Sequence, residues 1–380
     1  MGVSRSRSNL AFTVTVAVIV GVCALPVLLM LVVGAALAPL AAMLAVVAAL
    51  VPVVPLVACF LWLDRYEPEP RGLLGLALAW GAVVAVVATF LVHGIGGLVF
   101  DVSEAHSLAL WAPIVEEAAK GAFLFLLLWW RRDTLDGILD GIVYAGMLGI
   151  GFAFTENILY LATAYAESES SGMSPVGGLT ATFVVRCLFS PFAHPFFTAF
   201  IGIGIGIAVM SRQRWVRWLA PLGGYALAVI AHAAWNSSTL IGAGSGVPGF
   251  LVVYAVLMLP AFCGMTGLAV WTRISERRLL AASLHDAARR GLVPSTDIGW
   301  MVDLRARRYA RRYARQRGGP GAERAMRDYQ QTVIELGYLH HRYLRGTPPP
   351  DFAVRGGEYI ARIGAVRPLL AFPGQVVPIR

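Results

Sequence analysis

Long apolar runs separated by short polar loops make up most of the chain. A helix needs about 20 apolar residues to cross the hydrocarbon core of a bilayer, so these runs predict membrane spans. The first run is too long for the apolar region of a signal peptide, and we interpret it as a retained span. The pattern predicts an all-α polytopic membrane protein with about eight transmembrane helices, at residues 10–33, 38–63, 72–100, 108–130, 138–164, 178–210, 218–241 and 249–271.

The sixth run is longer than one span requires. It contains Arg186, Pro191 and Pro195, and a proline inside a helix kinks or ends it. We therefore expect a break within this run, with its first part partly re-entrant or interfacial. Its second part has glycines at 202, 204 and 206, which favour close packing of a neighbouring helix.

Arginines in the loops predict the orientation. Every second loop carries the arginines that flank the spans. The charged residues of the loops in between are acidic, with no lysine or arginine. The positive-inside rule then places both termini in the cytoplasm and predicts a multi-pass protein of the cell membrane. The arginine-bearing positions are 5, 7, 65, 71, 131, 132, 212, 214, 217, 273, 277 and 278.

Composition supports the membrane class and separates off a basic tail. The chain is 58% apolar and 14% charged, with a mean hydropathy of +0.69, whereas soluble domains contain more charge. We expect two N-terminal transmembrane helices (1–63), a cytoplasmic loop (64–71), a six-helix transmembrane core (72–272) and a basic cytoplasmic helical tail (273–380). The net charge of +9 is concentrated in the tail.

The basic tail predicts contact with anionic lipid at the membrane surface. Nucleic acid is not expected as a partner, because no recognition motif accompanies the arginines. Residues 305–313 predict a basic helix, Gly318-Gly-Pro-Gly predicts a break, and 322–344 predict a second helix. The last thirty residues are expected to be irregular.

Four predicted spans carry ionisable or amide side chains away from their ends. Such a charge costs at least ~2.5–3.5 kcal/mol near the bilayer centre, so the group needs an explanation. The only lysine lies three and four residues after two adjacent glutamates and can neutralise one of them, which leaves one carboxylate over. These residues are Glu116, Glu117 and Lys120 in the fourth span, Glu156 and Asn157 in the fifth, His194 in the sixth, and His232 and Asn236 in the seventh.

Depth in the membrane predicts that these residues meet. With a helical rise of ~1.5 Å per residue, five of them lie roughly 21–27 Å from the cytoplasmic ends of their helices. All five therefore fall in one layer of the outer half of the bilayer, which predicts a single shared site. They are Glu116, Glu156, His194, His232 and Asn236.

Two chemistries fit this set of residues. A carboxylate and a histidine can deprotonate a water and later protonate a leaving amine, with an amide or a second imidazole donating to the oxyanion. Zn²⁺ ligation by two histidines and one glutamate fits equally well, with Glu116, Glu156, His194 and His232 as candidate ligands. Both lead to peptide hydrolysis inside a membrane, and the chain lacks HExxH and GxSG motifs.

Two functions from other classes also fit buried glutamates and histidines. A proton- or cation-coupled transporter could relay charge through buried glutamates and histidines, although we find no inverted repeat of the kind common in transporters. A catalytically inactive membrane scaffold is a third interpretation, and it would tolerate alanine at all five positions.

Several motifs of the spans occur together in one known family. They are Leu63–Pro70 (LDRYEPEP), Ala112–Lys120 (APIVEEAAK), Gly151–Tyr160 (GFAFTENILY), the segment around His194 with its glycines, and His232–Asn236 (HAAWN). In this order they resemble the PrsW family of bacterial intramembrane proteases, which is related to the CAAX prenyl endopeptidases and the wider Abi group. The resemblance covers about residues 60–240.

The resemblance implies a role for each residue of the predicted site. Glu116 would be the general base, and Glu117 would form an ion pair with Lys120. Glu156 and His194 would assist the water or bind a divalent metal, and His232 with Asn236 would hold the oxyanion. The substrate would be a single-pass membrane protein cut near its outer face, which is an anti-sigma factor for the best-known members. For the loop Asp64–Pro68 we expect only a structural turn.

Overall fold

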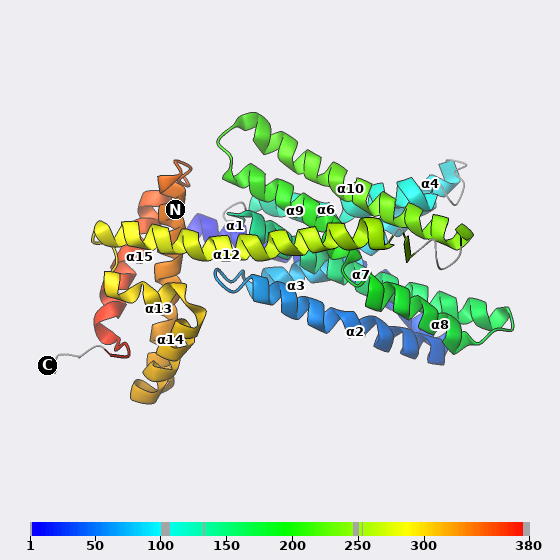
Figure 1. Ribbon diagram of the computed structural model, residues 1–380, viewed down its shortest axis with the longest axis horizontal. Coiled ribbons are helices and arrows are strands. Elements are labelled where there is room, and N and C mark those ends of the chain that lie inside the picture. The colour runs from blue at the N-terminus through cyan, green and yellow to red at the C-terminus, as the bar shows by residue number, and fades with distance from the viewer. Residues whose placement is uncertain (1, 100–106, 132–133, 246–250, 253, 375–380) are drawn as a thin grey trace. The chain divides into compact units, whose positions relative to one another are not determined.

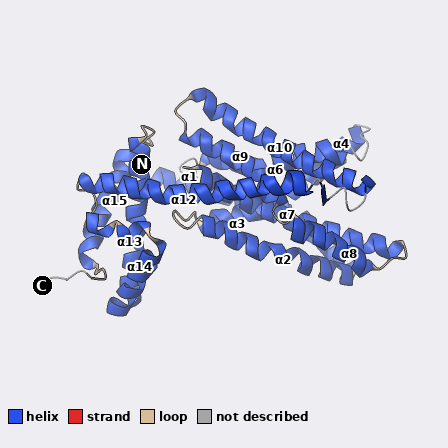
Figure 2. Ribbon diagram, viewed as in Figure 1, coloured by secondary structure: helices blue, strands red, loops and turns tan. Residues whose placement is uncertain are grey.

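The computed structural model describes residues 2–99, 107–131, 134–245, 251–252 and 254–374. Within these ranges every regular element is a helix (Figure 2), which confirms the predicted all-α class. The chain divides into two compact units. Unit 1 comprises Met1–Asp64 and Glu69–Ala269, and unit 2 comprises Arg65–Pro68 and Val270–Arg380.

The helices of unit 1 follow the predicted spans (Figure 1). Four short π-helical segments, labelled η, interrupt or precede them. The bounds are α1 Gly2–Leu37, α2 Pro39–Leu63, α3 Arg71–Ala79, η1 Trp80–Ala85, α4 Val86–Val99, η2 Ser107–Trp111, α6 Ala112–Trp130, α7 Ile138–Ser170, α8 Pro175–Phe183, η3 Val184–Phe189, α9 Ala193–Met210, α10 Arg214–Ser245 and η4 Tyr254–Met258. Helix α12, Leu259–Arg289, begins in unit 1 and continues in unit 2.

Seven helices in the described part of the chain are long and apolar enough to cross a membrane. They match every predicted span except 108–130. That segment is also helical, as η2 and α6, but three charged residues, Glu116, Glu117 and Lys120, lie within five positions of α6. Apolar side chains on the outer helices are exposed, as expected for contact with lipid: Leu29 is 64% exposed and Val54 is 70% exposed.

Helix α7 lies at the centre of unit 1 and packs against α9, α2, α8 and η1 (Figure 1). Every side chain from Leu139 to Ala153 is buried. A helix that is apolar on all sides is typical of such a central position. Because α7 contacts so many elements, it fixes the positions of the residues that its neighbours carry.

Glycines allow α7 and α9 to approach closely. A Cβ atom on Gly149 would lie 2.3 Å from the backbone nitrogen of Pro195, and one on Gly202 would lie 2.1 Å from the carbonyl oxygen of Gly141. Neither position can hold a larger residue without a backbone shift. The predicted packing role of the glycines at 202, 204 and 206 agrees with this geometry, and Gly204 faces Ala220 of α10 in the same way.

The sixth predicted span is broken, as expected. Helix α8 continues into η3, which ends at Phe189, and α9 begins only at Ala193. Ser190 has φ −126° and ψ 36°, outside the helical range. This break places His194 in the first turn of α9, beside Gly149 of α7.

A tight turn joins α2 to α3, as predicted for the segment after Leu63. The Asp64 carboxylate accepts the backbone N–H of Glu69 at 3.0 Å, and the Tyr144 hydroxyl donates to Oε2 of Glu69 at 2.7 Å. Burial raises the pKa of Asp64 to about 7. The two acidic side chains therefore connect the end of α2 and the residue Glu69 before α3 to α7, all within unit 1.

Unit 2 is a helical domain with its own apolar core, which includes Leu284, Met301, Tyr329 and Phe372. Its remaining elements are the 3₁₀ segment η5 Ser295–Asp297, α13 Gly299–Val302, α14 Leu304–Leu344, α15 Phe352–Val366 and the 3₁₀ segment η6 Arg367–Leu369. Helix α14 is interrupted at Gly318 and Gly319, where φ of Gly319 is 69°, as the glycine-rich sequence predicts.

The prediction that the last thirty residues are irregular is wrong. Helix α15 occupies half of them, and Ile363 is buried in the core of unit 2. Tyr359 and Val366 pack against the same core. The spacing of these three residues is helical, but Gly356-Gly357 and the preceding prolines weaken the sequence signal.

The arginines at the start of α14 fall into two groups. Arg307 is buried and donates to the carbonyl oxygens of Met301 and Tyr66, and burial lowers its pKa to about 10. Arg311 donates to Gln330 Oε1 at 2.6 Å. Arg305, Arg308 and Arg312 are exposed around a hollow with Tyr309. Contact of this surface with anionic lipid stays a prediction.

Substitution of Gly149 by alanine tests the contact between α7 and α9. We expect Gly149→Ala to lower the free energy of unfolding by about 1–3 kcal/mol, the usual cost of overpacking a core, because the added methyl group meets the backbone of Pro195. The measurement is thermal unfolding of the purified protein in detergent. Gly75→Ala is the matched control, since a Cβ there meets nothing within 4 Å. Equal stability of the two variants would contradict the close packing.

Candidate active site

Four helices of unit 1 bring the polar residues of the spans together. Helix α6 carries the two adjacent glutamates and the lysine, and α7, α9 and α10 each contribute one further ionisable residue. All except Glu156 have less than a tenth of their surface exposed. The cluster consists of Glu116, Glu117, Lys120, Glu156, His194 and His232.

Glu117 is fully buried and has all its charge satisfied by neighbours. Lys120 Nζ lies 2.5 Å from Oε1, and the Thr198 hydroxyl donates to Oε2 at 3.0 Å. His232 Nδ1 is 2.9 Å from Oε1. Since these three neighbours act as donors, Glu117 is the ionised partner of Lys120 and holds the site together.

The hydrogen bond to Glu117 fixes the tautomer of His232. Because the carboxylate accepts, Nδ1 carries the proton and Nε2 has a free lone pair. That nitrogen lies 3.7 Å from Oε2 of Glu116. The ring is stacked on Phe197, with centroids 4.6 Å apart and planes at 17°. His232 Nε2 is therefore a rigidly held acceptor or metal ligand.

Glu156 forms a second charge pair, with Arg186 of η3. The Arg186 guanidinium donates to Glu156 Oε2 and, through Nε, to Asn157 Oδ1 at 2.8 Å. It also covers the Tyr160 ring at 3.9 Å from the centroid. A π-helical segment inside a span often marks a functional position. Here the segment η3 directs the Arg186 side chain toward the Glu156 carboxylate.

His194 links the two charge pairs. Its Nε2 lies 2.7 Å from Glu156 Oε2, and its Nδ1 lies 3.2 Å from Lys120 Nζ. An ammonium only donates and a carboxylate only accepts, so the ring is neutral with its proton on Nε2. In metal sites, a ligating histidine usually donates its second ring N–H to a carboxylate, and its other nitrogen coordinates the metal. The bond between His194 Nε2 and Glu156 has this form.

Glu116 is the carboxylate left over. Its Oε2 is buried and has no hydrogen-bond partner in the described part of the chain. Lys120 Nζ is 3.8 Å away, beyond hydrogen-bond distance, and is already bonded to Glu117. With Glu117 paired to Lys120 and Glu156 paired to Arg186, two neutral histidines leave one uncompensated negative charge, on Glu116.

The cluster fits a divalent cation. Glu116, His194 and His232 each offer one ligand atom, and these atoms lie within 4.8 Å of one another. Two histidines and one glutamate are a common zinc set that leaves a position open for water. The orphaned oxygen of Glu116 and the free lone pair of His232 also converge where a cation would satisfy both.

Two residues predicted for the site, Glu156 and Asn236, lie outside the group of three possible metal ligands. The Glu156 carboxylate is held by Arg186 and His194, so it supports His194 and is not part of the three-residue ligand group. Asn236 lies one helical turn beyond His232 on α10 and is half-buried. Its role as an oxyanion donor stays a prediction.

Two residues that contact the cluster have no role predicted from the sequence. Arg186 is recognisable as a charge inside a span, but its partner lies thirty residues away on another helix. Thr198 gives no comparable signal, because threonine is common in membrane helices and only its contact with Glu117 identifies it.

Comparison with known proteins identifies a family and several relatives to which this chain is similar. Residues 69–273 match the sequence model of the PrsW family, described as intramembrane metalloproteases. The protease PrsW of Geobacillus kaustophilus is 27% identical over 189 residues, which is 48% of this chain and 77% of that protein.

Two further relatives are also named protease PrsW. The one from Bacillus subtilis is 27% identical over 170 residues, covering 43% of this chain and 69% of the relative. The one from Oceanobacillus iheyensis is 27% identical over 149 residues, covering 39% and 62%. No solved structure matches the chain. Since the family match spans more than half of the chain and contains every residue of the buried cluster, this protein belongs to the PrsW family of intramembrane metalloproteases.

Proposed function

We propose that this intramembrane protease cleaves a peptide bond of a single-pass membrane protein, with Glu116 as the general base. The observation that carries the proposal is the buried, unpartnered Oε2 of Glu116 beside the free lone pair of His232. A buried carboxylate without a partner costs several kcal/mol, so a water, a proton or a cation is required there. Family membership favours this interpretation over a coupled transporter.

In the proposed reaction a water molecule binds between Glu116 Oε2 and His232 Nε2. Glu116 removes one proton, the water oxygen attacks the carbonyl carbon, and the amide C–N bond breaks as the tetrahedral intermediate collapses. The proton held by Glu116 passes to the leaving amine. Glu117 and Lys120 remain an ion pair throughout, which keeps the His232 ring oriented.

The tautomer of His232 changes one role implied by the resemblance. A neutral ring with its proton on Nδ1 has no N–H at Nε2 to donate, so it cannot stabilise an oxyanion from that side. We assign oxyanion stabilisation to the Asn236 amide and assign water or metal binding to His232.

Glu116, His194 and His232 would hold the metal that the family description implies. Zn²⁺ bound there would act as a Lewis acid that lowers the pKa of a water ligand. The Nδ1 atom of His194 contacts Lys120 Nζ, so the ammonium and a cation compete for this atom. Glu116 Oε2 has no such competitor in the described part of the chain, and His232 Nε2 lies 3.7 Å from that oxygen.

The substrate and the position of the cut follow from topology and depth. We propose that both termini are cytoplasmic and that the protein resides in the cell membrane, because the arginines occur in alternate loops. The cluster then lies in the outer half of the bilayer, and the scissile bond lies near the outer face of the substrate. An anti-sigma factor with one span fits this requirement.

Replacement of Glu116 by glutamine tests whether cleavage requires the negative charge of this side chain, as general base or as metal ligand. Glu116→Gln keeps the shape of the side chain and removes its charge, and we expect cleavage to fall by at least ~100-fold. New N-termini of membrane proteins are quantified by mass spectrometry in bacteria that express the wild type or the variant. Glu169→Gln, at an exposed position of α7, is the control. Unchanged cleavage by the Glu116 variant at equal membrane levels would refute the role.

Metal analysis tests the cation site independently of activity. We expect about one zinc ion per chain in the purified wild type, the stoichiometry of a single catalytic site. Glu116→Gln and His232→Ala should each lose most of this metal, whereas His285→Ala, at an exposed position of unit 2, should keep it. A metal-free protein that still cleaves in the presence of a chelator would establish chemistry by glutamate alone.

A double-mutant cycle tests whether Arg186 acts through Glu156. Arg186→Gln leaves Glu156 without its cation, and we expect at least a tenfold loss of cleavage, because one partner of a buried pair is then unsatisfied. Arg186→Lys keeps the charge and should retain most activity. If the pair acts as one unit, Arg186→Gln combined with Glu156→Gln loses little more than the worse single variant. Fully additive losses would show that the two residues act separately.

A further inference from the structure

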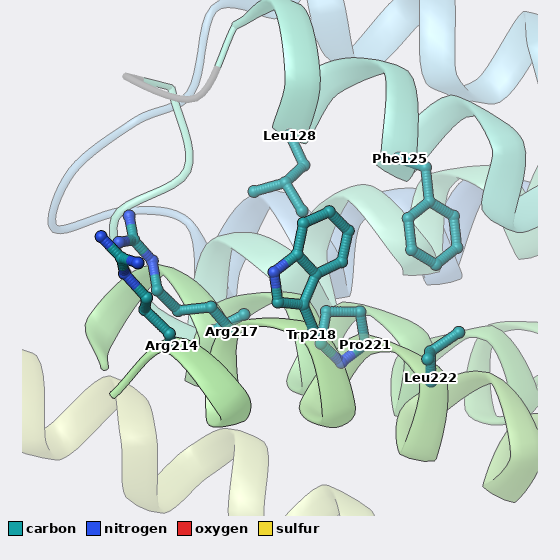
Figure 3. A pocket seen from close by; sticks show the side chains of 8 residues that line it. Phe125, Leu128, Arg214, Arg217, Trp218, Pro221 and Leu222 are labelled. Carbon is teal, nitrogen blue, oxygen red and sulfur yellow. The ribbon is translucent and has the colours of Figure 1, made fainter. Parts of the chain in front are cut away.

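A large apolar groove in unit 1 lies away from the active-site cluster. Its volume is about 720 Å³, within the range of ligand pockets, and it opens between α6, α9 and α10. Figure 3 shows Leu128, Phe125 and Trp218 lining it. Phe125 lies nine residues beyond Glu116 on α6, roughly 13 Å along the helix axis, so the groove does not contain the reacting groups.

One end of the groove is strongly basic. Arg214 and Arg217 are three residues apart on α10 and therefore adjacent on its surface. Figure 3 shows their guanidinium groups together at one end, with Pro221 and Leu222 toward the other. No acidic partner contacts either arginine in the described part of the chain.

This distribution matches an amphiphile with an anionic head. Two adjacent guanidinium groups suit the oxygens of a phosphate, and the apolar wall that continues from them suits an acyl chain. Trp218 lies between the two regions (Figure 3) and is 76% exposed, and tryptophan is enriched at the level of lipid headgroups. The arginines begin α10, at the end that the loop charges predict to be cytoplasmic.

We propose that this groove binds one anionic phospholipid, with its phosphate on Arg214 and Arg217 and an acyl chain along Leu128, Trp218 and Leu222. The groove is lined by the part of α6 after Glu116 and by the part of α10 before His232, so a bound lipid contacts both helices that carry the reacting groups. It therefore stabilises their spacing. This site is independent of the proposed cleavage chemistry.

The test is lipid binding to the full-length protein in detergent, measured by native mass spectrometry. Phosphatidylglycerol should bind more tightly than phosphatidylcholine, and Arg214→Gln with Arg217→Gln should weaken it roughly 25-fold, about fivefold per arginine. The matched control is Arg71→Gln with Arg278→Gln, which removes two exposed arginines of other helices and should change affinity less than threefold.

A second variant tests the acyl-chain part of the groove. Leu222 is 57% exposed, so Leu222→Trp fills the groove without overpacking the core and should weaken phosphatidylglycerol binding at least fivefold. Leu227→Trp, at a position 52% exposed on the same helix and outside the groove, should have no effect. Thermal unfolding without added lipid checks that each variant is folded.

Three outcomes would overturn the proposal. Equal loss of affinity in the arginine variant and its control would indicate general attraction between charges. Unchanged affinity in both groove variants would exclude the site. Displacement of phosphatidylglycerol by inorganic phosphate at equal concentration would assign the arginines to free phosphate.

Added phosphatidylglycerol should raise the melting temperature of the wild type and not that of the arginine variant.

Discussion

Charge balance within one buried cluster determines what unit 1 can bind and catalyse. Charged side chains inside a bilayer are expensive unless they are paired, and two of the three carboxylates are paired. Lys120 neutralises Glu117, and Arg186 neutralises Glu156. Glu116 has neither a cation of its own nor a hydrogen bond to Oε2 in the described part of the chain. The fold therefore creates a position that a water, a proton or a metal ion must complete.

The packing of unit 1 is what makes this balance possible. The cluster residues come from four helices, and α7 contacts α9 through glycines that bring the two backbones together. The break after η3 then starts α9 at Ala193, one residue before His194. Because the hydrogen bonds of His194 reach both charge pairs, a shift of α9 would disturb both of them. The close packing of α7 and α9 therefore determines whether His194 can contact both charge pairs.

The sequence was sufficient to predict the helical class, most spans, the break in the sixth span and the convergence of Glu116, Glu156, His194 and His232. These follow from hydrophobic length, proline chemistry and helical rise, all of which are local properties. It did not predict the partners of each charge, because these depend on the rotation of each helix about its axis. The contact of Arg186 with Glu156 joins residues thirty positions apart. Helix α15 was not predicted for a different reason. Its glycines are poor helix formers and weaken the local signal, although one face of the helix is buried.

Glu116 and His232 require a ligand from outside the protein between them. An X-ray structure of the lipid-embedded protein, with anomalous data at the zinc edge, would reveal this ligand. We predict a water or metal peak within about 2–3 Å of both Glu116 Oε2 and His232 Nε2, the range of zinc ligation and hydrogen bonding. A direct contact between these two atoms with no peak between them, or a Glu116 side chain turned toward lipid, would show that the site needs no such ligand.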